Sequence, residues 1–220
     1  MIVNGLSPQT EAIFEDVSKL ECIKEYCLIG GTALALQIDH RHSEDLDFCV
    51  WKKSNPDKTE VQWTTIFKEL SSLGEVRKNL LGFDHCDFYL KGTKVTFFVI
   101  NTKEPENLKR IPFINNIFIA DPASIGVLKI DVMQRRASHR DYYDIYALLQ
   151  SDISLQYLID GARRYSKYKF KTREIESLLV NGNRFTEDMH FHKLQPKYNV
   201  SLKDIEQFMI DKIKEMHQIF

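Results

Sequence analysis

The chain has 220 residues, of which 43% are hydrophobic and 28% are charged, and its formal net charge is -1. This ordinary globular composition argues against a disordered or fibrous protein, and the length suffices for one large domain or two small ones with a buried core. A net charge so close to zero excludes a globally basic nucleic-acid-binding protein, so any contact with RNA or DNA must come from a local basic patch.

The first half of the chain mixes helix and strand patterns. Ser7 is suited to cap a helix that Pro8 begins, and Lys91-Gly92-Thr93 separates two β-like runs as the turn of a hairpin. The sequence predicts helices over about 8–20, 32–39 and 61–73, and strands over 26–29, 45–51, 83–90 and 94–100.

The second half contains helical patterns almost exclusively, beginning after Asp121-Pro122. Helices are predicted over about 122–136, 139–150, 153–165, 172–180 and 201–216. We therefore expect an α/β (α+β) fold, with a small mixed sheet in a domain at 1–120 and an all-helical domain at 121–220.

Cysteine spacing and hydropathy indicate in which cellular compartment the protein is expected. The four cysteines form no C-x-x-C pair, no secretory leader is evident, and no apolar run approaches the ~18 residues of a membrane span. These features predict reduced thiols in a cytoplasmic protein without a membrane segment.

Gly30, Gly31 and Thr32 stand between a predicted strand and a predicted helix. Glycines allow positive φ and a close approach of the backbone to a ligand, and the N-terminus of a helix favours phosphate. An ordinary turn would use the same residues, so the glycine pair indicates a phosphate site only with further support.

Asp45 and Asp47 provide that support. Residues i and i+2 of a strand face the same side, so the two carboxylates point together while Leu46 and Phe48 enter a core. Two adjacent carboxylates repel each other, and Mg²⁺ bound with substrate phosphates would relieve that repulsion. A solvated acidic strand edge is the alternative. The glycine turn upstream favours a metal site that takes Mg²⁺ or Mn²⁺.

These residues resemble a known motif. The run from Gly30 to Leu36, then His40-Arg41, and then Ser43 to Phe48 is similar to the first motif of the polymerase-β-like nucleotidyltransferases. More narrowly, it resembles that of the AbiEii/AbiGii toxin family of type IV toxin–antitoxin systems. The resemblance extends over about 28–150 and includes a second block, made of Ile119-Ala120-Asp121-Pro122, Lys129 and the run from Arg140 to Tyr146.

The resemblance implies a Mg²⁺-dependent nucleotidyltransferase. It would move a nucleoside monophosphate from a nucleoside triphosphate (NTP) to a hydroxyl on a tRNA 3′ end or a protein side chain. Gly30, Gly31 and Thr32 would hold phosphates, and Asp45 and Asp47 would hold the metal. The resemblance also implies a toxin with a cognate antitoxin, acting in phage defence or growth arrest.

One position departs from the pattern. Many nucleotidyltransferases carry a third carboxylate on a later strand, and the matching position here is Thr96. Either another acid completes the site, or the chain is a nucleotide-binding module that has kept the fold with little turnover.

The second block adds candidate catalytic residues. Lys129 borders the apolar stripe of one predicted helix, and Asp141 and Asp144 border the stripe of the next. The resemblance places Lys129 on the triphosphate and one aspartate, preferably Asp144, on the metal or the attacking hydroxyl. The alternatives are an ion pair that ties the two helices together and a pair between Arg140 and Asp144.

Arg41 and Ser43 precede the carboxylates directly. We count both as candidate nucleotide-binding residues, because an arginine can bind phosphate in bidentate fashion. A salt bridge from Arg41 to Glu44 or Asp45 is the alternative.

A local basic patch lies at 161–173. It holds six basic residues and no acid, with Tyr165, Tyr168 and Phe170 between them. This pattern suits an RNA acceptor, through phosphate contacts and base stacking, although a solvated helix end would have the same composition. The candidate contacts are Arg163, Arg164, Lys167, Lys169 and Lys171.

Overall fold

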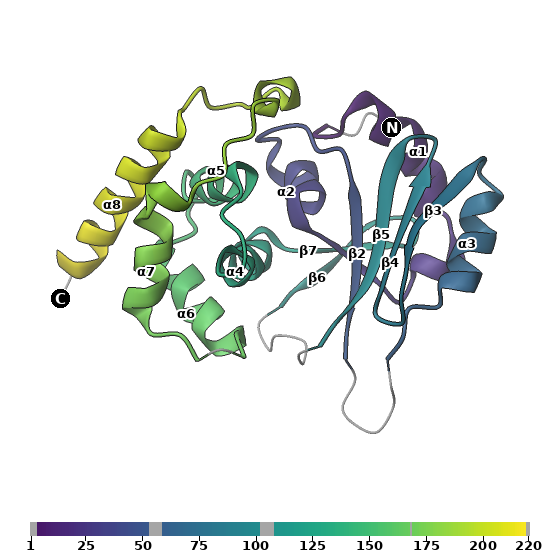
Figure 1. The fold of residues 1–220 in the computed structure, drawn as a ribbon, viewed down its shortest axis with the longest axis horizontal. Coiled ribbons are helices and arrows are strands. Elements are labelled where there is room, and N and C mark those ends of the chain that lie inside the picture. Colours follow the sequence, from purple (N-terminus) through teal and green to yellow (C-terminus); the bar gives the residue numbers. More distant parts are fainter. Residues whose placement is uncertain (1–3, 53–58, 102–107, 168, 219–220) are drawn as a thin grey trace. The chain divides into compact units, whose positions relative to one another are not determined.

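A computed structural model describes residues 4–52, 59–101, 108–167 and 169–218. The chain divides into two compact units, Met1–Asp121 and Pro122–Phe220. The first is a sheet with flanking helices and the second is made of helices (Figure 1).

The first unit is built on a mixed seven-stranded sheet in the order β3-β4-β5-β2-β1-β7-β6. Strand β2 pairs in parallel with β5, β1 pairs in parallel with β7, and the other neighbours are antiparallel. The strands are β1 (Cys27–Ile29), β2 (Leu46–Trp51), β3 (Val76–Leu81), β4 (His85–Leu90), β5 (Thr93–Ile100), β6 (Arg110–Ile114) and β7 (Ile117–Ala120).

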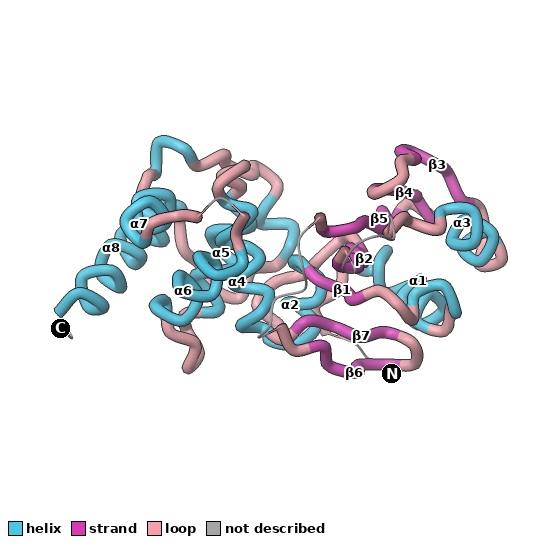
Figure 2. Tube along the Cα trace, turned by 90° about the horizontal axis from the view of Figure 1, so that it is seen from below, coloured by secondary structure: helices cyan, strands magenta, loops and turns pink. Residues whose placement is uncertain are grey.

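Helices cover both faces of this sheet. The helices α1 (Pro8–Ser18) and α3 (Trp63–Ser71) lie on one face, with the 3₁₀ turn η1 (Glu21–Ile23), and α2 (Gly30–Ile38) lies on the other (Figure 2). Phe48 and Phe97 stack with ring centroids 5.2 Å apart, and α3 reaches this aromatic core through Phe67. Because side chains alternate along a strand, the neighbours of Phe48 and Phe97 face the side of α2.

The mixed α/β fold expected from the sequence is present, but the sheet is larger than predicted. Strands β3, β6 and β7 were not predicted. Strand β3 is an edge strand without a buried residue, and β6 is an edge strand that contains Pro112 and a change of register. Edge strands that bury little lack the hydrophobic alternation on which strand prediction rests. The hairpin at Lys91-Gly92 is confirmed, with positive φ at both residues.

The second unit consists of helices in its described part. They are α4 (Pro122–Met133), α5 (His139–Leu148), α6 (Leu155–Tyr165), α7 (Thr172–Val180) and α8 (Leu202–Gln218), with 3₁₀ turns η2 (Gly182–Arg184) and η3 (Phe191–Leu194). All five predicted helices are present, and α4 ends at Met133 rather than near residue 136. None of the described helices has the length and apolar character needed to cross a membrane.

Candidate functional site

The glycine turn joins β1 directly to α2. Gly30 has a φ of 75°, which only glycine adopts without strain, and a Cβ there would lie 3.2 Å from Asp47 Oδ2. The residue before the helix, Ile29, provides no side-chain cap. The turn therefore brings the N-terminus of α2 close to a carboxylate, the geometry that suits a metal-bound phosphate.

Hydroxyl groups fix the loop that leads into β2. The Thr32 hydroxyl bonds to Ser43 Oγ at 2.8 Å and also contacts the Asp45 carbonyl oxygen. Thr10 donates to the Glu44 carbonyl at 2.6 Å. Thr32 and Ser43 are 3% and 6% exposed, so their side chains position the loop that carries the carboxylates. In this structure the hydroxyls thus bond within the protein, and the backbone N–H groups of the turn are the donors that would face a phosphate.

Arg41 lies beneath the glycine turn. It is 4% exposed, its Nη1 donates to the His42 carbonyl at 2.9 Å, and a Cβ on Gly31 would overlap its guanidinium. A phosphate contact or a salt bridge to an acid was predicted for Arg41, and its place beneath the turn was not. The sequence did contain a signal for this contact. Gly31, the second glycine of the turn, has no Cβ and leaves space for the guanidinium group of Arg41.

Asp45 and Asp47 flank the start of β2. Asp47 lies within the strand, opposite Ile29 of β1, whereas Asp45 precedes the first strand residue instead of beginning the strand as predicted. Both are partly exposed, while Leu46 and Phe48 between and after them are buried. The pair is therefore accessible at the end of the glycine turn.

The donor set fits Mg²⁺ bound together with a nucleotide. The described residues contain no cluster of three or more His, Cys, Asp or Glu side chains that could hold a metal alone. Mg²⁺ commonly takes one or two carboxylates and completes its shell with water and substrate phosphates. Asp45 and Asp47 beside the glycine turn match that requirement.

Thr96 stands next to Asp47 in the parallel register of β2 and β5. It is 3% exposed, and its Oγ1 has no hydrogen-bond partner among the described residues. Asp87 of β4 lies opposite Thr96 on the other side. On this sheet face, the next acidic residue after Asp47 is thus Asp87 on β4. It lies one strand farther from Asp47 than the third carboxylate of the motif would.

Sequence reasoning missed Asp87 and its partner Lys94. Asp87 Oδ2 lies 3.1 Å from Lys94 Nζ, and Asp87 Oδ1 lies 2.9 Å from His85 Nε2. The predicted hairpin could have located Asp87. A turn at Lys91-Gly92 pairs Leu90 with Thr93, and the same register pairs Asp87 with Thr96.

In the helical unit, Lys129 forms a buried ion-pair network. Its Nζ lies 3.0 Å from Asp141 Oδ1 and 2.6 Å from Asp144 Oδ2. Arg136 adds a second cation, 2.8 Å from Asp141. Burial alone would raise the pKa of Asp141, but Lys129 and Arg136 hold that pKa below its usual range. The lysine thus meets both aspartates, and Arg140 pairs with Asp188 at 2.7 Å.

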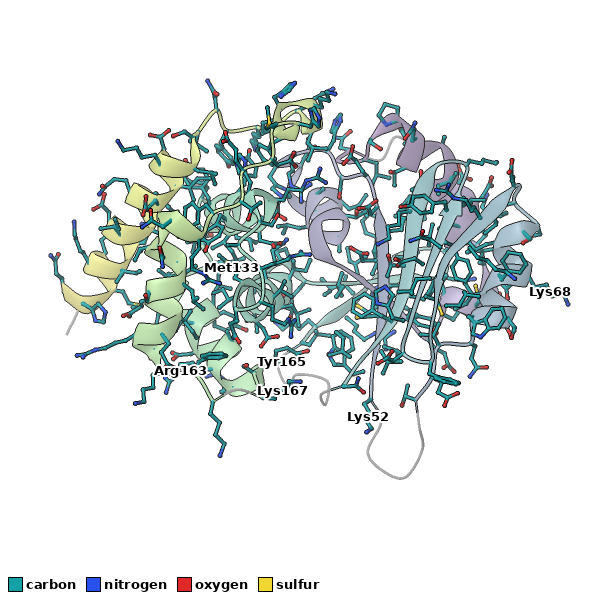
Figure 3. All side chains as sticks on the ribbon, viewed as in Figure 1. Lys52, Lys68, Met133, Arg163, Tyr165 and Lys167 are labelled. Atoms are coloured by element: carbon teal, nitrogen blue, oxygen red, sulfur yellow. The ribbon has the colours of Figure 1, made fainter. Side chains whose placement is uncertain are left out.

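The basic residues at the end of α6 border a cleft of about 330 Å³, lined by Asp160, Arg163, Arg164, Lys169 and Phe170. Arg163 and Lys167 have exposed side chains, and Figure 3 labels both of them together with Tyr165. Lys171 precedes α7 and is also exposed. Tyr168 lies outside the described residues. The cleft combines three cations and an aromatic ring, a surface that suits a nucleic-acid backbone.

Comparison with known proteins identifies the family to which these features belong. The model of a family described as "Nucleotidyl transferase AbiEii toxin, Type IV TA system" matches residues 13–218. An uncharacterised protein of Aquifex aeolicus is 27% identical over 213 residues, covering 94% of this chain and 95% of that protein.

A solved structure has the same fold. The nucleotidyltransferase toxin MenT4 of Mycobacterium tuberculosis superposes with a TM-score of 0.51 at 15% identity, covering 94% of this chain and 84% of that one. A polyadenylate synthase of Megavirus aligns over 66% of this chain, with a TM-score of 0.44 at 16% identity. This chain spans about a third of that longer protein, because 33% of it is covered.

Proposed function

The chain belongs to the AbiEii nucleotidyltransferase toxin family, and we propose that it transfers a nucleoside monophosphate from an NTP to a hydroxyl acceptor with the help of Mg²⁺. The supporting observation is the meeting of Gly30 and Asp47. A glycine with positive φ at a helix N-terminus lies against a carboxylate whose neighbour Asp45 is also accessible.

Each part of this arrangement has a task in phosphoryl chemistry. The backbone of Gly30 and Gly31 approaches the triphosphate, and Arg41 supports the turn from below. Thr32 and Ser43 fix the loop that carries Asp45, two residues before Asp47. Asp45 and Asp47 would hold a divalent ion, which would supply charge neutralisation on the phosphate oxygens. Positioning and electrostatics account for most catalysis of this class.

The experiment uses purified protein with Mg²⁺, total cellular RNA and each α-³²P-labelled NTP in turn. Gels that resolve RNA and protein separate the two acceptor classes. We expect label on one band, lost with EDTA and lost in the Asp45→Ala/Asp47→Ala variant. If the wild type binds NTP in a Mg²⁺-dependent manner yet labels nothing with any nucleotide or acceptor, the transfer reaction is wrong.

That last outcome would favour the second candidate, a nucleotide-binding module of the same fold with little turnover. Its specific support is Thr96, which occupies the place beside Asp47 where many relatives of this fold carry an acid. A site with two carboxylates holds metal less tightly than a site with three. Nucleotide binding without product is the result that separates this candidate from the enzyme.

For the acceptor, we propose RNA bound by the basic cleft. Reversing Arg163, Arg164 and Lys167 to glutamate should lower RNA affinity on the order of 100-fold and reduce the salt dependence of binding by about three ions. Filter binding at several salt concentrations measures both. The control reverses three exposed lysines elsewhere in the unit, Lys193, Lys197 and Lys203. Equal behaviour of the two triple variants would remove the cleft as the RNA site.

The family description names a type IV toxin–antitoxin system, so we propose that a cognate antitoxin restrains this chain and that the biological setting is phage defence or growth arrest in the cytoplasm. Induced expression of the chain alone should slow growth, and the Asp45→Ala/Asp47→Ala variant should not.

A further inference from the structure

The polar face of the sheet carries two rows of side chains that cross β2, β5 and β4. In the first row, Asp47, Thr96 and Asp87 are neighbours in register. The second row lies two residues earlier on each segment, with Lys94 on β5 and Asp45 just before β2. Leu46 pairs with Val95, so Asp45 and Lys94 are the two residues that directly precede this pair. Lys94 therefore lies on the same sheet face as Asp47, one strand away.

Lys94 is held in this place from the outer side. Its Nζ lies 3.1 Å from Asp87 Oδ2, and the Asp87 side chain is 9% exposed against 32% for Lys94. Asp87 is fixed in turn by His85 at 2.9 Å. Asp87 is thus the more buried partner of the ion pair. It holds the ammonium group of Lys94 in the region between β4 and the Asp45–Asp47 pair.

Electrostatics agree with this placement. Burial acts to lower the pKa of Lys94, yet the pKa is raised overall, first by Asp87 and then by the charges of Asp47 and Asp45. All three carboxylates thus favour the charged ammonium. The positive charge of Lys94 counters the mutual repulsion of the two carboxylates.

We propose that Lys94 is a positioning residue that acts through Asp45 and Asp47. In the metal-free protein its ammonium contributes positive charge beside the pair, and a divalent cation must bind against that charge. This inference rests on the proposed function, because it takes the pair to be the metal site. Its consequence is that free metal binds weakly and enters together with the triphosphate, whose charge compensates for Lys94.

The test measures metal binding directly, with Mn²⁺ as the probe and electron paramagnetic resonance of the free ion as the signal. Lys94→Met should bind Mn²⁺ about tenfold more tightly than the wild type, because a nearby positive charge has been removed. Lys94→Arg keeps the charge and should behave as the wild type. The control Lys52→Met makes the same substitution at an exposed lysine, labelled in Figure 3, that follows the other end of β2, about 23 Å along the strand.

Thermal melting gives a second signal that a simple cross-strand pair would not produce. Without metal, Lys94→Met should melt below the wild type, and added Mn²⁺ should raise its melting temperature more than that of the wild type. Lys94→Gln repeats the measurement with a polar side chain if the methionine variant fails to fold. Unchanged or weaker Mn²⁺ binding in the folded variants would overturn the inference.

The wild type separates this inference from the proposed function. If wild-type binding of Mn²⁺ is lost in Asp45→Ala/Asp47→Ala while Lys94→Met matches the wild type, the metal site stands and the role of Lys94 is wrong. If neither the wild type nor Lys94→Met binds Mn²⁺, with or without a non-hydrolysable NTP, both proposals fall.

Discussion

Replacing Asp47 with asparagine is expected to reduce nucleotidyl transfer on the order of 1000-fold while leaving the folded protein at least as stable as the wild type. Asparagine keeps the shape of the side chain beside Gly30 but removes the charge that binds a metal-bound triphosphate. It also removes one member of a repelling pair, so the free energy of unfolding should stay constant or rise. Initial rates of label transfer and melting in the absence of metal measure the two effects.

Asp16→Asn is the matched control, because Asp16 is exposed on α1, the helix that covers the opposite face of the sheet. It should leave transfer unchanged. The same rate loss in both variants would point to a general effect of charge. A variant at Asp47 that loses activity only in proportion to a fall in stability would show that the carboxylate is structural, and the transfer site would have to lie elsewhere.

The sequence was most informative where local chemistry and local structure coincide. A glycine pair between an apolar run and a helix pattern, followed by alternating acids, predicted the turn and the strand that carries Asp47. The helices of the second unit were predicted because each buries a periodic apolar stripe. These features depend on neighbours within a few residues, and the sequence displays them directly.

Other features required the pairing of distant strands. Asp87 and Thr96 become neighbours of Asp47 only through the order of β4, β5 and β2, and the parallel pairing of β2 with β5 cannot be read from a local pattern. The hairpin register was within reach of the sequence, but the place of the hairpin in the sheet was not. The burial of Arg41 under Gly31 was not predicted for a similar reason, because it depends on how the loop returns to the turn.

Replacing Lys129 with methionine is expected to destabilise the helical unit by about 3–5 kcal/mol. Unlike a change at Asp47, this substitution should therefore have a large effect on stability. Methionine preserves the buried stem but leaves Asp144, which is fully buried, without the cation that lies 2.6 Å away. Asp141 retains Arg136 and so loses less. Circular dichroism during heating should show a melting temperature lower by more than about 10 °C. Lys203→Met, at an exposed position on α8, should melt like the wild type.

Activity per folded molecule, measured well below the melting transition, then distinguishes stability from chemistry at Lys129. Because Lys129 resembles the family's lysine, we expect its replacement to lower transfer by more than the loss of folded protein explains. Asp144→Asn should also lower transfer, with a smaller loss of stability, because Lys129 still forms its ion pair with Asp141. If both variants melt early and the remaining folded molecules transfer at the wild-type rate, the network is purely structural. The reacting groups would then be confined to the glycine turn and the carboxylates of the first unit.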